Sequence, residues 1–380
     1  MIIKNVKIVL SDKVIENGWI EIENDVIKSI NSGVCHEEGI DGENKILMPG
    51  FIDCHTHGGY GVDFENSSVE NYMKFSKMLT QEGITSYIHS SVTNSLENNK
   101  KYLQTFNEFK EKDNEYAKCL GVHLEGPFIC KEKKGAHELA LLENPNVATM
   151  KELNNVAHNN IAMVTYAPEL DNGDFVKYLL ENNIVPAAGH SNCDYPVFDK
   201  DVALGVKHIT HLFNGMSGIA HQKPGLALAA MDAKNVLCEV ITDGIHIDRQ
   251  VLKLIYRLIG FERIAIITDS MIAKGMPDGN YKLGNLDVIK VGMKATLTDG
   301  ATLAGSAANF NHNVKVMYET IDNLTLNQLI HMTSINAAKQ FNIFDKTGSI
   351  EVNKYADLVL VDNDMNVYKT FVNGKCVYEQ

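Results

Sequence analysis

Short apolar runs recur through the middle of the chain, and longer segments with the spacing of amphipathic helices separate them. Eight such runs lie at residues 46–55, 84–90, 119–126, 161–169, 184–191, 206–214, 236–244 and 263–270. Helix-like segments follow several of these runs, for example residues 69–83 and 174–183. Buried strands that alternate with helices in this way predict an α/β fold, a TIM-like (β/α)8 barrel whose parallel strands close into a ring.

Both ends of the chain show a different pattern, in which apolar and polar residues alternate as in half-buried strands. These segments are residues 6–10, 19–25, 26–30, 356–362, 367–374 and 375–380. We therefore expect a small β-sandwich domain built from residues 1–47 and 345–380, and a barrel domain from residues 48–344. The long connection from Met271 to Ala304 is expected to form a β-hairpin insertion over the barrel mouth.

Histidine and acidic residues fall at the ends of the predicted barrel strands. They are His55 and His57 on the first strand, Glu125 on the third, His190 on the fifth, His211 on the sixth and Asp269 on the eighth. The C-terminal ends of barrel strands converge on one mouth, where active sites are built, so we expect these side chains to lie together. Two residues apart on an extended strand, both imidazoles of the H-x-H pair point to the same side. This mixture of imidazole and carboxylate groups predicts a site for Zn²⁺ or Fe²⁺.

Each of these residues also has a purely structural explanation when it is taken alone. An H-x-H pattern occurs often by chance, and Glu125 or Asp269 could cap the segment that follows it. The joint pattern favours a metal site, because all six residues end predicted strands and none lies within a predicted helix.

The order of motifs along the whole chain resembles the N-acetylglucosamine-6-phosphate deacetylases of the amidohydrolase superfamily. The matching motifs are H-x-H at 55–57, HLEGP at 123–127, KGAH at 134–137, GHS at 189–191, THLFN at 210–214, DGIH at 243–246, TD at 268–269 and LAGS at 303–306. The resemblance implies a metal-containing barrel with a small β-sandwich domain, usually homodimeric, that hydrolyses an acetamide.

The resemblance also implies roles for individual residues. Glu125, His190 and His211 match the ligands of the ion present throughout the family. His55 and His57 match the ligands of a second ion found in some members, so one or two divalent ions, zinc or iron, are expected. Asp269 corresponds to the catalytic acid and base. The residues that match stretches lining the sugar phosphate are Ala136, His137, Asn214, Gly215, Asp243, His246, Leu303, Ala304 and Gly305.

One position departs from the family pattern. Gln222 stands where the family typically has an arginine that binds the phosphate, and glutamine is neutral and lacks the bidentate fork. The adjacent Lys223 could supply a point charge instead, and His246 could add a donor. The backbone N–H groups of Asn214 and Gly215 could also bind the phosphate. A helix is expected to begin there, and the N-terminus of a helix binds anions.

Composition and net charge argue against some classes of binding partner. A net charge of −13 argues against nucleic acid, and no apolar run approaches the length of a membrane span. The N-terminus lacks the cationic flank and cleavage site of a secretory signal. The seven scattered cysteines form no C-x-x-C pair, which favours a reducing, cytoplasmic location.

Other functions fit part of the pattern. Dihydroorotases and hydantoinases share H-x-H but carry a carboxylated lysine on the fourth strand, and residues 161–169 contain no lysine. A metal-binding scaffold or sugar-phosphate sensor would not need an acid and base such as Asp269. The favoured prediction is hydrolysis of N-acetyl-D-glucosamine 6-phosphate to D-glucosamine 6-phosphate and acetate. The galactosamine epimer and a non-phosphorylated N-acetyl sugar stay open as alternatives.

Overall fold

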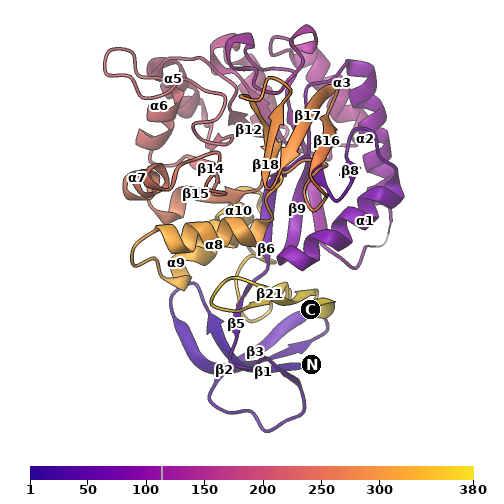
Figure 1. Ribbon diagram of the computed structural model, residues 1–380, viewed down its shortest axis with the longest axis vertical. Helices are drawn as coiled ribbons and strands as arrows, with labels where there is room; N and C mark the ends of the chain where they lie inside the picture. Colours follow the sequence, from indigo (N-terminus) through magenta and orange to yellow (C-terminus); the bar gives the residue numbers. More distant parts are fainter. Residues whose placement is uncertain (113) are drawn as a thin grey trace.

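A barrel of parallel strands forms the larger part of the computed structural model, which describes residues 1–112 and 114–380 (Figure 1). The hydrogen-bonded order is β15-β14-β13-β12-β11-β10-β9-β6, and every neighbouring pair is parallel. The strands are β6 (Phe51–Thr56), β9 (Ile84–Ser91), β10 (Lys118–Glu125), β11 (Ile161–Tyr166), β12 (Val185–Ala188), β13 (His208–Ile209), β14 (Leu237–Ile241) and β15 (Ile264–Ile267). The predicted eight-stranded barrel is confirmed.

Helices cover the outside of this ring (Figure 1). They are α1 (Val69–Leu79), α2 (Leu96–Lys110), α3 (Val147–Val156), α4 (Asp174–Glu181), α5 (Tyr195–Leu204), α6 (Leu226–Asp232), α7 (Arg249–Ile259), α8 (Phe310–Thr320), α9 (Leu326–Ile330) and α10 (Asn336–Gln340). Polar caps start several of them. The Ser68 hydroxyl accepts the Asn71 N–H before α1, and the Ser95 hydroxyl accepts the Asn98 N–H before α2. No helix among the described residues is both long enough and apolar enough to cross a membrane.

The ring closes between its first and last strands at the end where the predicted site residues lie. A bridge joins Thr56, the last residue of β6, to Ser270 after β15. The Asp269 N–H donates to the His55 carbonyl at 2.9 Å, and the His57 N–H donates to the Ser270 carbonyl at 2.8 Å. Closure of the barrel therefore brings three of the predicted site residues side by side.

Both termini meet in a smaller sheet below the barrel (Figure 1). Its strands follow the order β22-β21-β20-β5-β1-β2-β3, with β4 beside β1, so hydrogen bonds join all of them in one mixed sheet. They are β1 (Ile2–Val9), β2 (Val14–Glu23), β3 (Val26–Ser32), β4 (Ile40–Asp41), β5 (Ile46–Pro49), β20 (Leu358–Val361), β21 (Val367–Val372) and β22 (Lys375–Glu379). The small β domain made from both ends is thus present, while its predicted boundaries stay predictions.

The first predicted barrel run, residues 46–55, serves both parts of the molecule. Its first half is β5 of the small sheet and its second half is β6 of the barrel. Gly50 separates them, and a β-carbon there would lie 2.2 Å from a methyl carbon of Thr85, so the crossing leaves no room for a side chain.

The predicted insertion is an antiparallel sheet in front of the barrel, orange in Figure 1. Its strands are β16 (Gly279–Leu283), β17 (Leu286–Val291), β18 (Lys294–Leu297) and β19 (Leu303–Ser306). The segment that leads into it is anchored by a fully buried ion pair, Lys274 Nζ to Glu82 Oε1 at 2.9 Å. Glu82 also accepts the Tyr60 hydroxyl at 2.5 Å and the Phe310 N–H at 2.6 Å. A buried charge held this way fixes the insertion to the barrel wall.

We expect Lys274→Met to lower the free energy of unfolding by about 3–5 kcal/mol, because Glu82 would keep its charge in a buried site without a cation. Urea unfolding followed by circular dichroism measures the change. The matched control is Lys282→Met, which removes an exposed ion pair with Asp287 on the same insertion and should change stability by about 0.5 kcal/mol or less. Equal effects of the two substitutions would contradict this anchoring role.

Candidate metal centre and active site

Glu125 lies at the centre of the barrel mouth, between two groups of imidazoles. One group consists of His55, His57 and Glu125, and the other of Glu125, His190 and His211. In each group the nitrogen and oxygen atoms that could bind a metal lie within 4.8 Å of one another. The single carboxylate of β10 therefore belongs to both groups, as a carboxylate that bridges two ions would.

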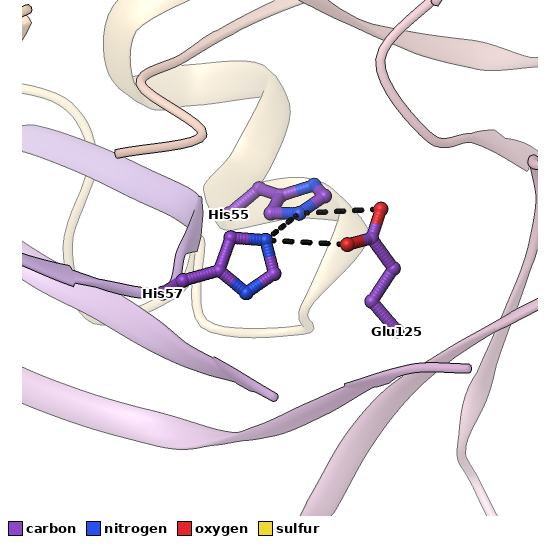
Figure 2. Close-up of side chains that lie close together, drawn as sticks. All are labelled: His55, His57 and Glu125. Carbon is purple, nitrogen blue, oxygen red and sulfur yellow. Dashed lines mark hydrogen bonds and ion pairs between the residues drawn. The ribbon is translucent and has the colours of Figure 1, made fainter. Parts of the chain in front are cut away.

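The two carboxylate oxygens of Glu125 face different imidazoles. Oε2 lies 3.2 Å from His57 Nε2, and Oε1 lies 3.6 Å from His55 Nε2 (Figure 2). The same Oε1 lies 2.7 Å from His211 Nε2 and 3.2 Å from His190 Nε2. Burial raises the pKa of Glu125, but the neighbouring imidazoles, His55 first, hold it well below its usual range. The carboxylate is therefore ionised, as a metal ligand must be.

Two of the imidazoles turn Nε2 toward the centre of the site and Nδ1 toward an acceptor. His55 Nδ1 lies 2.8 Å from a carboxylate oxygen of Glu239, and His190 Nδ1 lies 2.8 Å from the Lys133 carbonyl. Both partners accept hydrogen bonds, so each Nδ1 carries a ring proton and Nε2 is the atom that can bind a metal. The Nε2 atoms of His190 and His211 are only 3.0 Å apart, and those of His55 and His57 are 3.2 Å apart. Such a cluster of ring nitrogens suits divalent cations.

Strained backbone places several of these side chains. His190, His211 and Asp269 have φ angles of 44°, 27° and 49°, in the left-handed region that residues with a β-carbon rarely adopt. Strain of this kind clusters at functional sites. Gly215 beside them has φ of 54°, and a β-carbon there would lie 2.8 Å from His190 Nδ1, so this turn requires glycine.

Asp269 reaches the group of ligands that β6 carries. Its Oδ1 lies 3.1 Å from His57 Nε2 and 3.6 Å from His55 Nε2. Burial raises the pKa of Asp269, but the contacts with His57 and His55 outweigh burial and leave this pKa below its ordinary value. An ionised carboxylate beside the metal ligands can accept a proton from water.

His137 has the opposite tautomer to His55. The Thr93 N–H donates to His137 Nδ1 at 3.1 Å, so the ring proton lies on Nε2, 3.5 Å from Glu125 Oε2. Burial lowers the pKa of His137 to about 4, which keeps the ring neutral. His137 therefore offers a hydrogen-bond donor at the site.

A cavity of about 300 Å³ opens above these residues. The predicted residues that line it are His57, Glu125, Ala136, His137, His190, His211, Asn214, Gly215, His246, Asp269, Leu303 and Gly305. The insertion also contributes Leu283, Ala301 and Thr302, as expected for a segment over the mouth. Among the lining residues of the described chain, none is lysine or arginine.

Four predicted residues lie outside this lining. His55 and Ala304 are fully buried behind it, and Asp243 contacts His246 through a 2.7 Å hydrogen bond. Gln222 is exposed on the loop before α6. The helix expected at Asn214 was a wrong prediction, since α6 begins only at Leu226. The chain forms a turn instead, in which the Asn214 N–H donates to the His211 carbonyl at 2.9 Å and is not free for an anion.

Two contacts of the site were missed by the sequence analysis. Glu239 on β14 contacts His55, and its signal was a charged residue inside the apolar run 236–241. Thr93 acts through its backbone N–H, which no residue type reveals.

We expect divalent metal to stabilise the folded protein, because metal ligands converge in the native state only. Zinc added to metal-free protein at one hundred times its Kd should contribute about 2.7 kcal/mol, seen as a higher Tm. Glu125→Gln should abolish most of this gain, since both groups share that carboxylate. The control Asp201→Asn changes a buried carboxylate that accepts the Tyr166 hydroxyl, and it should keep the gain. A Tm that zinc does not raise would contradict the metal site.

Comparison with known proteins agrees with this geometry. The model of the amidohydrolase family matches residues 46–377. An N-acetylglucosamine-6-phosphate deacetylase of Bacillus subtilis (strain 168) is 34% identical, with all of this chain and 97% of the relative covered.

Solved structures extend the similarity to three dimensions. The crystal structure of an N-acetylglucosamine-6-phosphate deacetylase from Thermotoga maritima superposes with a TM-score of 0.91 at 34% identity, over the full length of both chains. A mutant N-acetyl-D-glucosamine-6-phosphate deacetylase from Mycobacterium smegmatis, in complex with N-acetyl-D-glucosamine-6-phosphate, gives a TM-score of 0.93 at 26% identity over 99% of both chains. The chain belongs to the amidohydrolase family, in the group of the N-acetylglucosamine-6-phosphate deacetylases.

Proposed function

We propose that this enzyme hydrolyses the acetamide of N-acetyl-D-glucosamine 6-phosphate to D-glucosamine 6-phosphate and acetate. The observation that carries the proposal is the arrangement around Glu125, where two groups of metal ligands, an ionised Asp269 and the His137 donor face one cavity. Amide hydrolysis needs these three elements, namely an electrophilic centre, a group that moves protons, and a donor for the developing oxyanion.

We propose that Glu125, His190 and His211 hold one divalent ion and that His55, His57 and Glu125 hold a second. Imidazole and carboxylate ligands suit zinc or ferrous iron. When bound, such an ion supplies Lewis acidity, which lowers the pKa of water and polarises a carbonyl oxygen. Because Glu125 belongs to both groups and β11 carries no lysine, this site would differ from the lysine-bridged sites expected in dihydroorotases and hydantoinases.

Two residues of the chain handle the protons and charges of the reaction. Asp269 takes a proton from the attacking water and delivers it to the amide nitrogen, which leaves only when it is protonated. The Nε2–H of His137 donates to the carbonyl oxygen as negative charge develops on it. The neutral state of His137 keeps this proton in place at working pH, because its pKa lies near 4.

Recognition of the 6-phosphate falls to His246. Its Nδ1 contacts Asp243 Oδ2 at 2.7 Å, and Asp243 Oδ1 accepts the backbone N–H of residues 245 and 246. Burial lowers the pKa of His246, but the Asp243 carboxylate outweighs burial and raises it above the ordinary value. Protonated His246 then supplies positive charge to a cavity without lysine or arginine. Lys223 is less suited, because it is exposed and pairs with Asp194 at 3.3 Å.

We propose that a second copy of the chain packs beside this cavity. The apolar side chains of Ile219 and Ile245 are 51% and 36% exposed in the segments that also carry Gln222 and His246. Covering them favours the homodimer that the resemblance implies. The cytoplasmic location stays a prediction from the cysteine pattern.

Replacing Asp269 tests the chemistry directly. We expect the enzyme to release acetate from N-acetyl-D-glucosamine 6-phosphate and to stop when a chelator is added. Asp269→Asn should bind metal normally but lose about 10²–10⁴-fold in kcat, because the amide cannot accept the proton. The control Asp287→Asn, on the exposed face of the insertion, should keep full activity. Near-normal kcat in Asp269→Asn would remove this residue from the mechanism, and no acetate release by the unmodified enzyme would refute the function.

Phosphate recognition is tested by the ratio of kcat/KM for N-acetyl-D-glucosamine 6-phosphate to kcat/KM for N-acetyl-D-glucosamine. We expect His246→Gln to lower this ratio roughly 10–100-fold, the effect of losing one hydrogen bond to a charged group. In the unmodified enzyme the ratio should fall as pH rises through the raised pKa of His246, since the imidazolium exists only below it. Lys223→Gln is the matched control and should leave the ratio unchanged. A ratio near one in the unmodified enzyme would overturn the phosphate assignment, and N-acetyl-D-galactosamine 6-phosphate as a parallel substrate tests the epimer.

A further inference from the structure

Glu239 is a charged residue in the interior of the barrel. It lies on β14 between the apolar residues Cys238 and Val240, and its side chain is fully buried. Transfer of a carboxylate from water to such a place costs several kcal/mol unless hydrogen bonds and opposite charges compensate it. A carboxylate buried here must therefore be compensated by neighbouring groups that donate hydrogen bonds to it.

Four donors surround the Glu239 carboxylate, three nitrogens and the Cys54 thiol, whose sulfur lies 3.9 Å from Oε1. His55 Nδ1 lies 2.8 Å from Oε2, the His211 backbone N–H lies 3.1 Å from the same oxygen, and His208 Nε2 lies 2.9 Å from Oε1. A carboxylate oxygen that lies within hydrogen-bond distance of a ring nitrogen accepts the ring proton. The contact with Glu239 therefore places the His55 proton on Nδ1.

The consequence reaches the centre of the site through His55. With Nδ1 held by Glu239, the imidazole turns Nε2, the atom that can bind a metal, toward His57 and Glu125, as Figure 2 shows. A carboxylate behind a histidine ligand fixes the orientation of the ring and raises its basicity.

The two groups of metal ligands differ in how their imidazoles are held. In the group around His190 the Nδ1 proton is held by a backbone carbonyl, that of Lys133. In the group around His55 it is held by the Glu239 side chain. Nδ1 of His57 and Nδ1 of His211 have no hydrogen-bond partner among the residues that the structure describes. Each group thus contains one imidazole whose Nδ1 is held by an acceptor. Only for His55 is that acceptor a side chain, which a substitution can remove.

We propose that Glu239 is the positioning residue that makes His55 a metal ligand and so determines whether the group of His55, His57 and Glu125 holds its own ion. The proposal rests on the metal site of the proposed function. Glu239 touches no substrate. It holds the ring of His55 at Nδ1 but contacts His211 only at the backbone N–H, so His55 is the ligand whose ring it positions. Its loss weakens the ion on the His55 side and spares the ion held by Glu125, His190 and His211.

Titration of metal-free protein with Co²⁺, followed by visible absorption and by competition with a chelator, gives the number of ions and a Kd for each. We expect the unmodified protein to bind two. Glu239→Gln keeps the shape but loses the charge, and Glu239→Asp keeps the charge but withdraws it from His55. Both should weaken the second ion roughly 10–100-fold, the usual effect of losing such a partner, and change the first less than about threefold.

Two controls show whether the effect passes through His55. Asp201→Asn changes another buried carboxylate, hydrogen bonded to Tyr166, and should alter neither Kd. His55→Asn should leave one ion, and adding Glu239→Gln to it should have no further effect on that ion.

Several outcomes would overturn the proposal. They are two unchanged Kd values in both Glu239 variants, an equal loss of both ions, or a single ion in the unmodified protein. Acetate release by the unmodified protein is measured on the same samples. An active enzyme whose Glu239 variants keep both ions refutes only the role of Glu239, whereas an enzyme that binds Co²⁺ and releases no acetate refutes the proposed function.

Discussion

The carboxylate of Glu125 sets the geometry of the whole barrel mouth. Four imidazoles, from β6 and the residue that follows it and from the segments after β12 and β13, converge on its two oxygens, at distances from 2.7 to 3.6 Å. An anion buried in this way needs positive charge beside it, which protonated imidazoles or a bound divalent cation can supply. The strained backbone at His190 and His211 is tolerated because this demand is met in one arrangement.

Much of this site could be predicted from the sequence, because strand ends are where a barrel collects its chemistry. Six residues spaced over more than half of the chain meet at the mouth, and the order of the apolar runs was enough to place them. The turn after His211 could not be predicted, since positive φ angles at His211 and Gly215 depend on packing against neighbouring loops. Contacts through the backbone, such as that of Thr93 with His137, also cannot be predicted from residue types. Glu239 could have been identified from the sequence, because it is a single charged residue in an apolar strand.

The parts outside the barrel serve the same cavity. The insertion contributes Leu283 and residues 301–303 to its wall, and the buried Lys274–Glu82 pair fixes its base. The small sheet shares the run 46–55 with the barrel, so β5 leads directly into the strand that carries His55 and is followed by His57. Among the described residues, the lining of the cavity holds imidazoles and carboxylates but no lysine or arginine. Under the proposed function, His246 supplies the positive charge that the arginine of the family would otherwise bring to the phosphate.

The seam between β6 and β15 gives the fold a property beyond catalysis. Backbone hydrogen bonds at His55, His57 and Asp269 close the ring at the same residues that face the metal ligands. By thermodynamic linkage, a change that stabilises this seam would also strengthen metal binding, and a bound ion would in turn hold the first and last strands of the barrel together. Thermal stability and metal affinity are therefore coupled through the same backbone contacts.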